Sequence, residues 1–587
     1  MKTPVKTVKG PDIIIVHVQE LFIYLHRTVS VFRYHFTLAV IIGCLKHQLG
    51  FSFLILRLIQ FLAAFRAENR TVFVLIMTFR TVEHFAFSLF MFAITAVPAR
   101  YIQFYALDCR KSSRSALRTG LLIYKATVIL RENRKRGPAD GFYAVKARKI
   151  SMSAEWRQKF HLEPSKGWIN DPNGLCYHKG KYHVYFQFSP DSAEGEGRKC
   201  WGHFESSDDM QSFDFTGIVL DQDIPEDRSG VYSGSAVVLN DEIHIFYTGN
   251  VLIPGNYDYV NEGRGANQIH VVTKDGVTMG AKRIVLRNPD YPEFCSCHVR
   301  DPKVRFEDGK WKMVLGARTK DDKGGVLFYE ADDPDDWHFR RFVSVDDMGY
   351  MWECPDLFDV QGQKFLGISP QGLKHEEYRY QNVFSSGYFM YSEDGDKLEN
   401  FEEFDYGFDF YAPQTFTDKN GDRVLIGWMG IGGIPYTNPT TELGWQHCLT
   451  VPRKLTLAPD GRICQTPLVF YTEQQEGGPF AVSADDLSSD KFSISIEDAV
   501  VSYEDGVLSL RFTGTSGYGR DIRKVRCGEI TDINILVDSS SLEIFANGGR
   551  YVMSSRSYPG KLPEVRVEGC NVLIRGIRPV EVKGFEG

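Results

Sequence analysis

The 587-residue sequence lacks several short motifs that mark metal and phosphate sites. Its eleven cysteines are scattered, and the closest pair, Cys295 and Cys297, does not have zinc-knuckle spacing. It contains no HExxH pair, no EF-hand loop and no glycine-rich phosphate loop. An odd number of cysteines in a large chain is typical of free thiols in a reducing compartment. We therefore predict a cytoplasmic protein without a metal or cofactor.

Residues 1–150 are poor in glycine and in acidic residues. They hold 6 of the 53 glycines, with 23 Lys and Arg against 7 Asp and Glu, whereas the rest of the chain is acidic. The apolar runs at 36–45 and 85–99 are shorter than the roughly 18 residues of a membrane-spanning helix. The first 30 residues also fit a secretory signal poorly.

Three interpretations of residues 1–151 stay open: a membrane-associated region, a disordered basic extension, or translated upstream DNA that is not part of the protein. The third is favoured because Met152 lies just before the composition becomes ordinary. We expect protein made from Met152 to be soluble and active.

From residue 168 the chain shows alternating apolar residues and turn residues, which predict strand after strand. One hairpin pattern returns five times, at intervals of 61, 68, 53 and 59 residues. Its turns are HKGK, LNDE, EDGK, VQGQ and KNGD, at Gly180, Asp241, Gly309, Gly362 and Gly421. A hairpin repeat of about 40 to 60 residues is typical of propeller blades, and five blades lie within the usual range.

A polar or aromatic residue precedes each of these turns by 8 to 10 residues. These residues are Asp171, Ser233, Asp301, Glu353 and Tyr411. Alone, the stretch WINDPNG around Asp171 would indicate only a turn. In a propeller, however, the first strand of each blade lines the central channel, so equivalent positions converge on one pocket. Three of these five residues are acidic.

Several carboxylates around one pocket suit either a metal or a sugar, and no closely spaced set of metal ligands is present. Glycoside hydrolysis requires two carboxyl groups across the scissile bond. Aromatic side chains beside them can stack on sugar faces, although each alone is more often a core residue. The available aromatics are Trp168, Trp201, Tyr232, Trp352 and Tyr411.

The motifs WINDPNG, FYTGN, RDPK, WECPDLF and GWQHCLTVPRKL, in this order, resemble glycoside hydrolase family 32, the invertases and related β-fructosidases. The resemblance runs from about His161 to the C-terminus, and the segment ILVDSSSLEIFANGGRYVMSSRSYP is similar to the family's C-terminal β-sandwich. SPQGL, DYGFDFYAPQT and GWQHCLT resemble the bacterial sucrose-6-phosphate hydrolase branch. We thus expect an all-β chain, with a five-bladed β-propeller at 152–470 and a β-sandwich at 471–587.

The resemblance implies a retaining enzyme that cleaves the β-fructofuranosyl bond of sucrose or sucrose 6-phosphate. Asp171 would be the nucleophile, Glu353 the acid/base and Asp301 the residue that stabilises the transition state. Arg300 would either contact the substrate or form an ion pair with Asp301. The implied substrate-binding residues are Trp168, Asn170, Gln187, Trp201, Tyr232, Ser233, Arg300 and Trp428. The segment EWRQKFHLEP leads into the first blade, and we expect His161 near the rim of the pocket.

Two departures from the family pattern affect the aromatic wall of the sugar site. The loop before Trp201 reads DSAEGEGRKC, without the additional Trp-Gly of many members, and GWMGIGG lacks a second tryptophan. A fructan exo-hydrolase, a fructosyltransferase and a non-catalytic carbohydrate-binding propeller remain alternatives. A small sugar is the expected partner, nucleic acid is not expected, and a membrane is expected only if residues 1–151 are part of the protein.

Overall fold

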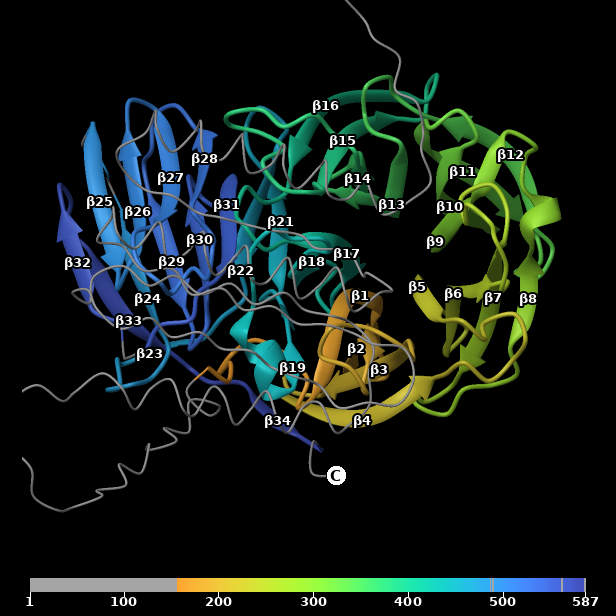
Figure 1. Cartoon of the computed structure of the whole chain (residues 1–587), viewed down its shortest axis with the longest axis horizontal. Coiled ribbons are helices and arrows are strands. Elements are labelled where there is room, and N and C mark those ends of the chain that lie inside the picture. The colour runs from red at the N-terminus through yellow and green to blue at the C-terminus, as the bar shows by residue number, and fades with distance from the viewer. Residues whose placement is uncertain (1–155, 486, 488–489, 561–562, 585–587) are drawn as a thin grey trace, which may run out of the picture. The chain divides into compact units, whose positions relative to one another are not determined.

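The computed structural model describes residues 156–485, 487, 490–560 and 563–584 (Figure 1). The interpretation of residues 1–151 as an extension falls outside this part of the chain. Within it, no helix is long and apolar enough to cross a membrane. Nearly all of its regular structure is strand, and the short 3-10 helices η2 (Asn288–Asp290) and η3 (Pro439–Leu443) interrupt it.

Five antiparallel sheets form the blades of a propeller, and the predicted blade number is confirmed. The first blade comprises β1 (Gly167–His178), β2 (Lys181–Ser189), β3 (Cys200–Ser206) and β4 (Ser212–Leu220). The second comprises β5 (Val231–Leu239), β6 (Glu242–Leu252), β7 (Arg264–Thr273) and β8 (Arg283–Leu286). The third comprises β9 (Cys295–Glu307), β10 (Lys310–Thr319), β11 (Gly324–Ala331) and β12 (His338–Val343).

The fourth blade comprises β13 (Met351–Val360), β14 (Gln363–Gln371), β15 (Gly387–Ser392) and β16 (Lys397–Glu403). The fifth comprises β17 (Tyr411–Thr417), β18 (Arg423–Met429), β21 (Arg453–Leu457) and β22 (Ile463–Pro467), and the short β20 (Cys448–Leu449) pairs with β18. The ring closes where β19 (Trp445–Gln446) pairs in parallel with β1. Figure 1 shows that β1, β5, β9, β13 and β17 are the innermost strands.

The predicted hairpin turns join the first two strands of each blade. In the first four blades both central residues have positive φ, as in Lys179 (48°) and Gly180 (83°). Such turns match the right-handed twist of paired strands. Glycine, Asn and Asp tolerate this backbone conformation, which explains why they supply the sequence signal.

The C-terminal sandwich packs two sheets over a core of aliphatic residues, as predicted. One sheet contains β23 (Tyr471–Thr472), β24 (Phe480–Ala484), β29 (Ile533–Val537), β30 (Ser541–Ala546), β31 (Tyr551–Arg556) and β33 (Leu573–Ile577). The other contains β25 (Lys491–Ile496), β26 (Ala499–Glu504), β27 (Val507–Phe512), β28 (Ile522–Arg526) and β32 (Val565–Glu568). The chain then returns to the propeller, where β34 (Glu581–Lys583) pairs in parallel with β4.

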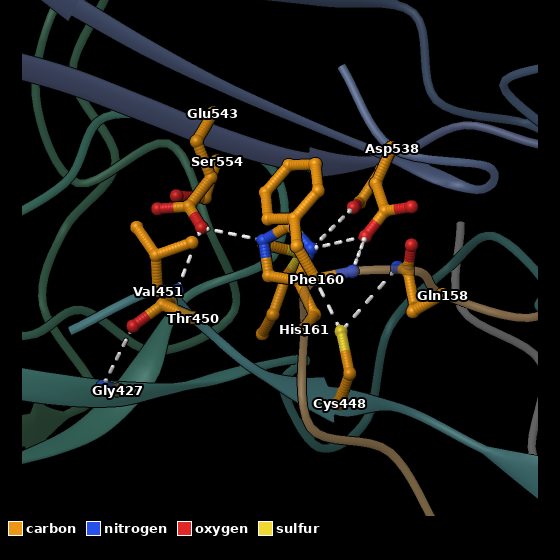
Figure 2. A network of polar contacts seen from close by, with 12 residues as sticks. Gln158, Phe160, His161, Gly427, Cys448, Thr450, Val451, Asp538, Glu543 and Ser554 are labelled. Atoms are coloured by element: carbon orange, nitrogen blue, oxygen red, sulfur yellow. Dashed lines mark hydrogen bonds and ion pairs between the residues drawn. The ribbon is translucent and has the colours of Figure 1, made fainter. Parts of the chain in front are cut away.

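A buried network of ion pairs joins the propeller to the sandwich (Figure 2). His161 lies between two sandwich carboxylates, with Nδ1 at 2.8 Å from Asp538 and Nε2 at 2.7 Å from Glu543. Arg453 of β21 binds Glu543 from the propeller side and also contacts Asp405 at 3.2 Å. Each of these side chains is fully buried.

This position corrects an expectation from the sequence. We expected His161 near the rim of the sugar pocket, because it precedes WINDPNG by a few residues. The structure instead uses both of its ring nitrogens at the domain interface. Burial alone would lower the pKa of His161, but the hydrogen bonds and charges of Asp538 and Glu543 raise that pKa to about 9.

This raised pKa predicts that stability falls in alkaline solution. A folded pKa of about 9, above the ordinary 6.5, gives a contribution that is complete below about 6.5 and lost as pH rises through about 9. His161→Gln leaves the buried Asp538 without its cation and Glu543 with Arg453 alone, and it should lower the free energy of unfolding by about 3 kcal/mol at neutral pH. Its stability should also depend less on pH between neutrality and about pH 10.

Urea unfolding of wild type and variant across this pH range would measure both effects. His338→Gln is the matched control, because that histidine side chain is 60% exposed. An equal alkaline loss of stability in wild type and His161→Gln would contradict the assignment.

Candidate active site

The first strand of every blade carries a β-bulge at the same place. In each blade two residues of the first strand lie opposite one residue of its partner, as Cys354 and Pro355 lie opposite Ile368. The bulged pairs are 170–171, 232–233, 301–302, 354–355 and 412–413. Bulges re-aim side chains and are frequent next to active sites.

The bulges correct our alignment of the repeats. Asp171 and Ser233 are the second residues of their bulges, whereas Asp301 is the first residue of its own. Glu353 and Tyr411 are the last paired residues before theirs. The five predicted residues therefore occupy three successive positions rather than one. The extra residue of a bulge cannot be located by counting back from a turn.

Asp171 is held by two neutral donors. Ser233 donates to its Oδ2 at 2.5 Å, and the Asn170 amide donates to its Oδ1 at 3.1 Å. The same Asn170 amide nitrogen donates to Gln187, whose own amide contacts the Val231 carbonyl at 3.3 Å. These contacts fix the orientation of the Asp171 carboxylate.

Glu353 is surrounded by donors from three blades. Arg300 donates to its Oε1 from Nε at 3.1 Å and from Nη2 at 2.7 Å. Gln371 and Tyr411 each donate to its Oε2 at 2.6 Å. The Tyr411 hydroxyl has a second acceptor, the Ser369 carbonyl at 3.2 Å.

Asp301 links the two other carboxylates through Cys354. Its Oδ2 accepts the Cys354 N–H at 3.0 Å, and the Cys354 thiol lies 3.5 Å from Asp171 Oδ2. Asp301 and Cys354 both have left-handed backbones, with φ of 63° and 45°. Such values are uncommon outside glycine and store backbone strain. Asp301 thus binds a bulge N–H that the sheet leaves unpaired.

The clustering of acids perturbs their protonation. Burial raises the pKa of Asp171, against the donors Ser233 and Asn170. Burial also raises the pKa of Asp301 to about 7, with Glu353 and Asp171 adding to the rise and Arg300 opposing it. Asp301 therefore loses its proton near neutral pH rather than in acid.

Most of the predicted sugar-contacting residues gather around these acids. Trp168 donates to Asn170 at 3.1 Å, and its ring lies 5.6 Å from that of Trp428 and 4.3 Å from that of His447. Tyr232 lies in the bulge beside Ser233. Trp168, Trp428 and His447 therefore form one aromatic cluster, which Asn170 links to Asp171.

Trp201 is the exception, and its predicted role in stacking on sugar is wrong. Its ring is 0% exposed and packs among the core residues Tyr185 and Tyr247. Its Nε1 donates to the Tyr232 carbonyl at 2.9 Å. Trp201 therefore packs between the first and second blades, where its hydrogen bond to Tyr232 holds the bulge of β5.

Sequence reasoning missed Gln371 and His298, and it placed Tyr411 among the five converging residues without predicting its hydrogen bond to Glu353. Gln371 is opposite Met351 in the β13–β14 hairpin, so the hairpin register was the available signal. His298 accepts a hydrogen bond from Arg300 at 2.6 Å. It precedes Arg300 by two residues, and the alternation of a strand places both side chains on one face.

A cavity of about 360 Å³ lies between the third and fourth blades, and none of the three carboxylates lines it. Cations in its wall are paired with acids, as Lys303 is with Asp356 at 3.1 Å and Arg341 with Asp396 at 2.7 Å. The convergent polar groups of Asp171, Asp301 and Glu353 therefore define the candidate active site.

Asp171 accepts hydrogen bonds from neutral donors, whereas Glu353 accepts them from Arg300, Gln371 and Tyr411. Two carboxyl groups in such different surroundings can perform nucleophilic and acid–base chemistry at one centre. Comparison with known proteins identifies the family. The model of the glycosyl hydrolases family 32 N-terminal domain matches residues 161–467, and that of the family 32 C-terminal domain matches 460–570. The chain belongs to glycosyl hydrolase family 32.

Relatives in this family cover most of the described chain. A sucrose-6-phosphate hydrolase of Bacillus subtilis is 38% identical over 70% of this chain and 90% of its own length. The structure of sucrose-6-phosphate hydrolase from Lactobacillus gasseri has a TM-score of 0.65 and 26% identity, covering 73% of this chain and 94% of that one. A variant of a Bombyx mori family 32 β-fructofuranosidase in complex with sucrose has a TM-score of 0.62 and 28% identity, covering 80% and 100%.

The hydrogen bond from the Cys354 N–H to Asp301 predicts that two substitutions of Asp301 differ in stability. Asp301→Asn keeps an acceptor oxygen for the Cys354 N–H, whereas Asp301→Ala leaves this buried donor unpaired, at a cost of about 1–3 kcal/mol. Both remove one acid from the cluster, so comparing them isolates the bulge contact. Urea unfolding should rank wild type and Asp301→Asn above Asp301→Ala. Equal stability of the two variants would show that the bulge does not depend on this hydrogen bond.

Proposed function

We propose that the chain is a retaining β-fructofuranosidase that hydrolyses sucrose or sucrose 6-phosphate. The products are fructose and glucose or glucose 6-phosphate. The observation that carries this proposal is the linkage of Asp171, Asp301 and Glu353 through the Cys354 bulge and Arg300. The names of the bacterial relatives and the sucrose complex of the Bombyx mori relative support the substrate class.

Asp171 acts as the nucleophile. Ser233 and Asn170 hold its two oxygens in place, so that the carboxylate approaches the anomeric carbon of the fructosyl unit in one orientation. Attack forms a bond between an Asp171 oxygen and that carbon, while the bond to the glucosyl oxygen breaks. The electron pair of the broken bond takes a proton from Glu353, and a covalent fructosyl-enzyme results.

Glu353 first donates a proton and later accepts one, so its surroundings must suit both forms. Tyr411 meets this need through its two acceptors. When Glu353 is ionised, the hydroxyl donates to it. When Glu353 is protonated, the hydroxyl turns its hydrogen toward the Ser369 carbonyl and accepts the acid proton. Burial raises the pKa of Tyr411 well above its ordinary value, so the hydroxyl stays protonated throughout.

In the second half of the reaction Glu353 removes a proton from water. The water oxygen bonds to the anomeric carbon, and Asp171 leaves as a carboxylate. Asp301 stabilises the positive charge that develops on the fructosyl ring in both transition states. The Arg300 guanidinium interacts mainly with Glu353, because its contact with Asp301 is 3.9 Å, against 2.7 Å to Glu353.

The alternatives receive less support. A carbohydrate-binding propeller has no need for a strained bulge that joins three acids. A fructan exo-hydrolase or a fructosyltransferase would use the same acids, but the Bacillus subtilis relative, which is 38% identical, is named for sucrose 6-phosphate instead. The partner is a small sugar. We propose a cytoplasmic location, which the free state of the described cysteines supports.

Replacement of either reacting acid should abolish turnover. Asp171→Ala removes the nucleophile, and Glu353→Ala removes the acid/base, with losses of several orders of magnitude expected in kcat. Added azide should partly rescue Glu353→Ala on a fructoside with an activated leaving group, because neither departure nor attack then needs the acid/base. Azide should not rescue Asp171→Ala in this way.

Fructose release by purified variants, with circular dichroism as a folding control, measures both effects. Near-normal sucrose cleavage by either variant would refute the roles given to these residues.

The double displacement also predicts the stereochemistry. Two inversions at the anomeric carbon give net retention, so β-fructofuranose should be the first product released. Proton NMR during early turnover of sucrose, before mutarotation, distinguishes the anomers. Initial release of the α-anomer would exclude a covalent intermediate on Asp171.

A further inference from the structure

Three arginines, Arg300, Arg264 and Arg318, lie next to one another on the side of the site where Arg300 binds Glu353. His298 accepts the Arg300 Nη1 hydrogen bond at its Nδ1 and donates from Nε2 to the Tyr259 carbonyl at 3.1 Å. Burial, Arg300, Arg264 and Arg318 together lower the pKa of His298 to about 3. The His298 imidazole is therefore neutral, and it lies among the guanidinium groups of Arg300, Arg264 and Arg318.

Arg318 lies at the outer end of this group. Ala317 of β10 pairs with Val299 of β9, so Arg318 and His298 both adjoin this pair of residues. The Arg318 guanidinium stacks over the ring of Tyr350 at 4.7 Å, three residues before Glu353. Its ion-pair partner Asp322, at 2.6 Å, is 63% exposed, and such surface pairs bind weakly.

Arg264, at the start of β7, shares the Tyr259 carbonyl with His298. Its Nε donates to the Tyr259 carbonyl at 3.2 Å and its Nη1 to the Asn250 amide oxygen at 2.6 Å. Both acceptors are neutral. In the described part of the chain no carboxylate forms an ion pair with Arg264, so its charge remains uncompensated.

We infer that Arg318 and Arg264 bind the phosphoryl group of a phosphorylated leaving sugar. The inference rests on the proposed function, in which Glu353 protonates the glucosyl oxygen. The glucosyl unit then lies past Glu353, on the side where Arg300 and His298 lead outward to the two arginines. Planar guanidinium groups bind phosphate through paired hydrogen bonds, and a phosphate dianion displaces an exposed carboxylate such as Asp322. Sucrose 6-phosphate is accordingly the preferred substrate over sucrose.

The test compares two substrates in purified full-length wild type and variants. Wild type should show a higher kcat/KM for sucrose 6-phosphate than for sucrose. In Arg318→Gln and in Arg264→Gln the ratio of the two kcat/KM values should fall about tenfold, which corresponds to one charge-assisted hydrogen bond. Arg318→Lys, which keeps the charge, should recover part of the ratio.

Arg340→Gln is the matched control, since it removes one arginine of the same blade whose partner is Glu330 at 3.1 Å. This variant should keep the wild-type ratio. Glucose 6-phosphate should inhibit wild type more strongly than glucose or inorganic phosphate, and Arg318→Gln should remove that difference. Stronger inhibition by inorganic phosphate than by glucose 6-phosphate would point to a free-anion site and overturn the inference.

The failures of the two proposals are distinguishable. If wild type releases fructose from neither substrate, the proposed function itself is wrong. If wild type hydrolyses both substrates with equal kcat/KM, or if the ratio survives in both Arg318→Gln and Arg264→Gln, the enzyme is a β-fructofuranosidase but the phosphate site is refuted.

Discussion

One extra residue in the first strand of each blade is the constraint on which the active site depends. A regular strand would alternate its side chains between the two faces of the blade, whereas the bulge turns them toward the propeller axis. The bulge also leaves backbone N–H groups without a ladder partner, and buried donors of this kind need another acceptor. Neighbouring blades supply it, through Asp301 for Cys354, Thr248 for Asp301 and Ser386 for Ala412. The site is therefore held by contacts between blades as much as by contacts within them.

This arrangement gives Asp301 two tasks that reinforce each other. Its carboxyl group satisfies a strained bulge, and the same burial brings it close enough to Asp171 and Glu353 for their charges to interact. Burial and these neighbouring charges raise the pKa of Asp301 to about 7, so Asp301 ionises near neutral pH. The strain of the fold and the protonation of the site thus have one structural origin.

Much of this could be predicted from sequence, because turns and alternation are local signals. The hairpin repeat predicted five blades, and the polar residues before the turns predicted which strands meet at the axis. The bulge could not be predicted, since it is defined by pairing with a second strand, and so the five residues were assigned to one position. Trp201 and His161 were misplaced for a related reason: an aromatic or a histidine near a motif carries no signal for the face or domain that it contacts.

The arginines beyond Glu353 could be predicted from the sequence even less than the bulges. Arg264, Arg300 and Arg318 come from three different strands, and no stretch of sequence brings them together; only the packing of the second blade against the third does so. The acids to which we assign the cleavage of the glycosidic bond lie in or beside the bulges, where backbone geometry leaves little freedom. Arg264 and Arg318 instead lie at strand ends near loops, which tolerate change more readily. The fold can therefore alter the leaving group that it accepts without disturbing the carboxylates that react with the fructosyl unit.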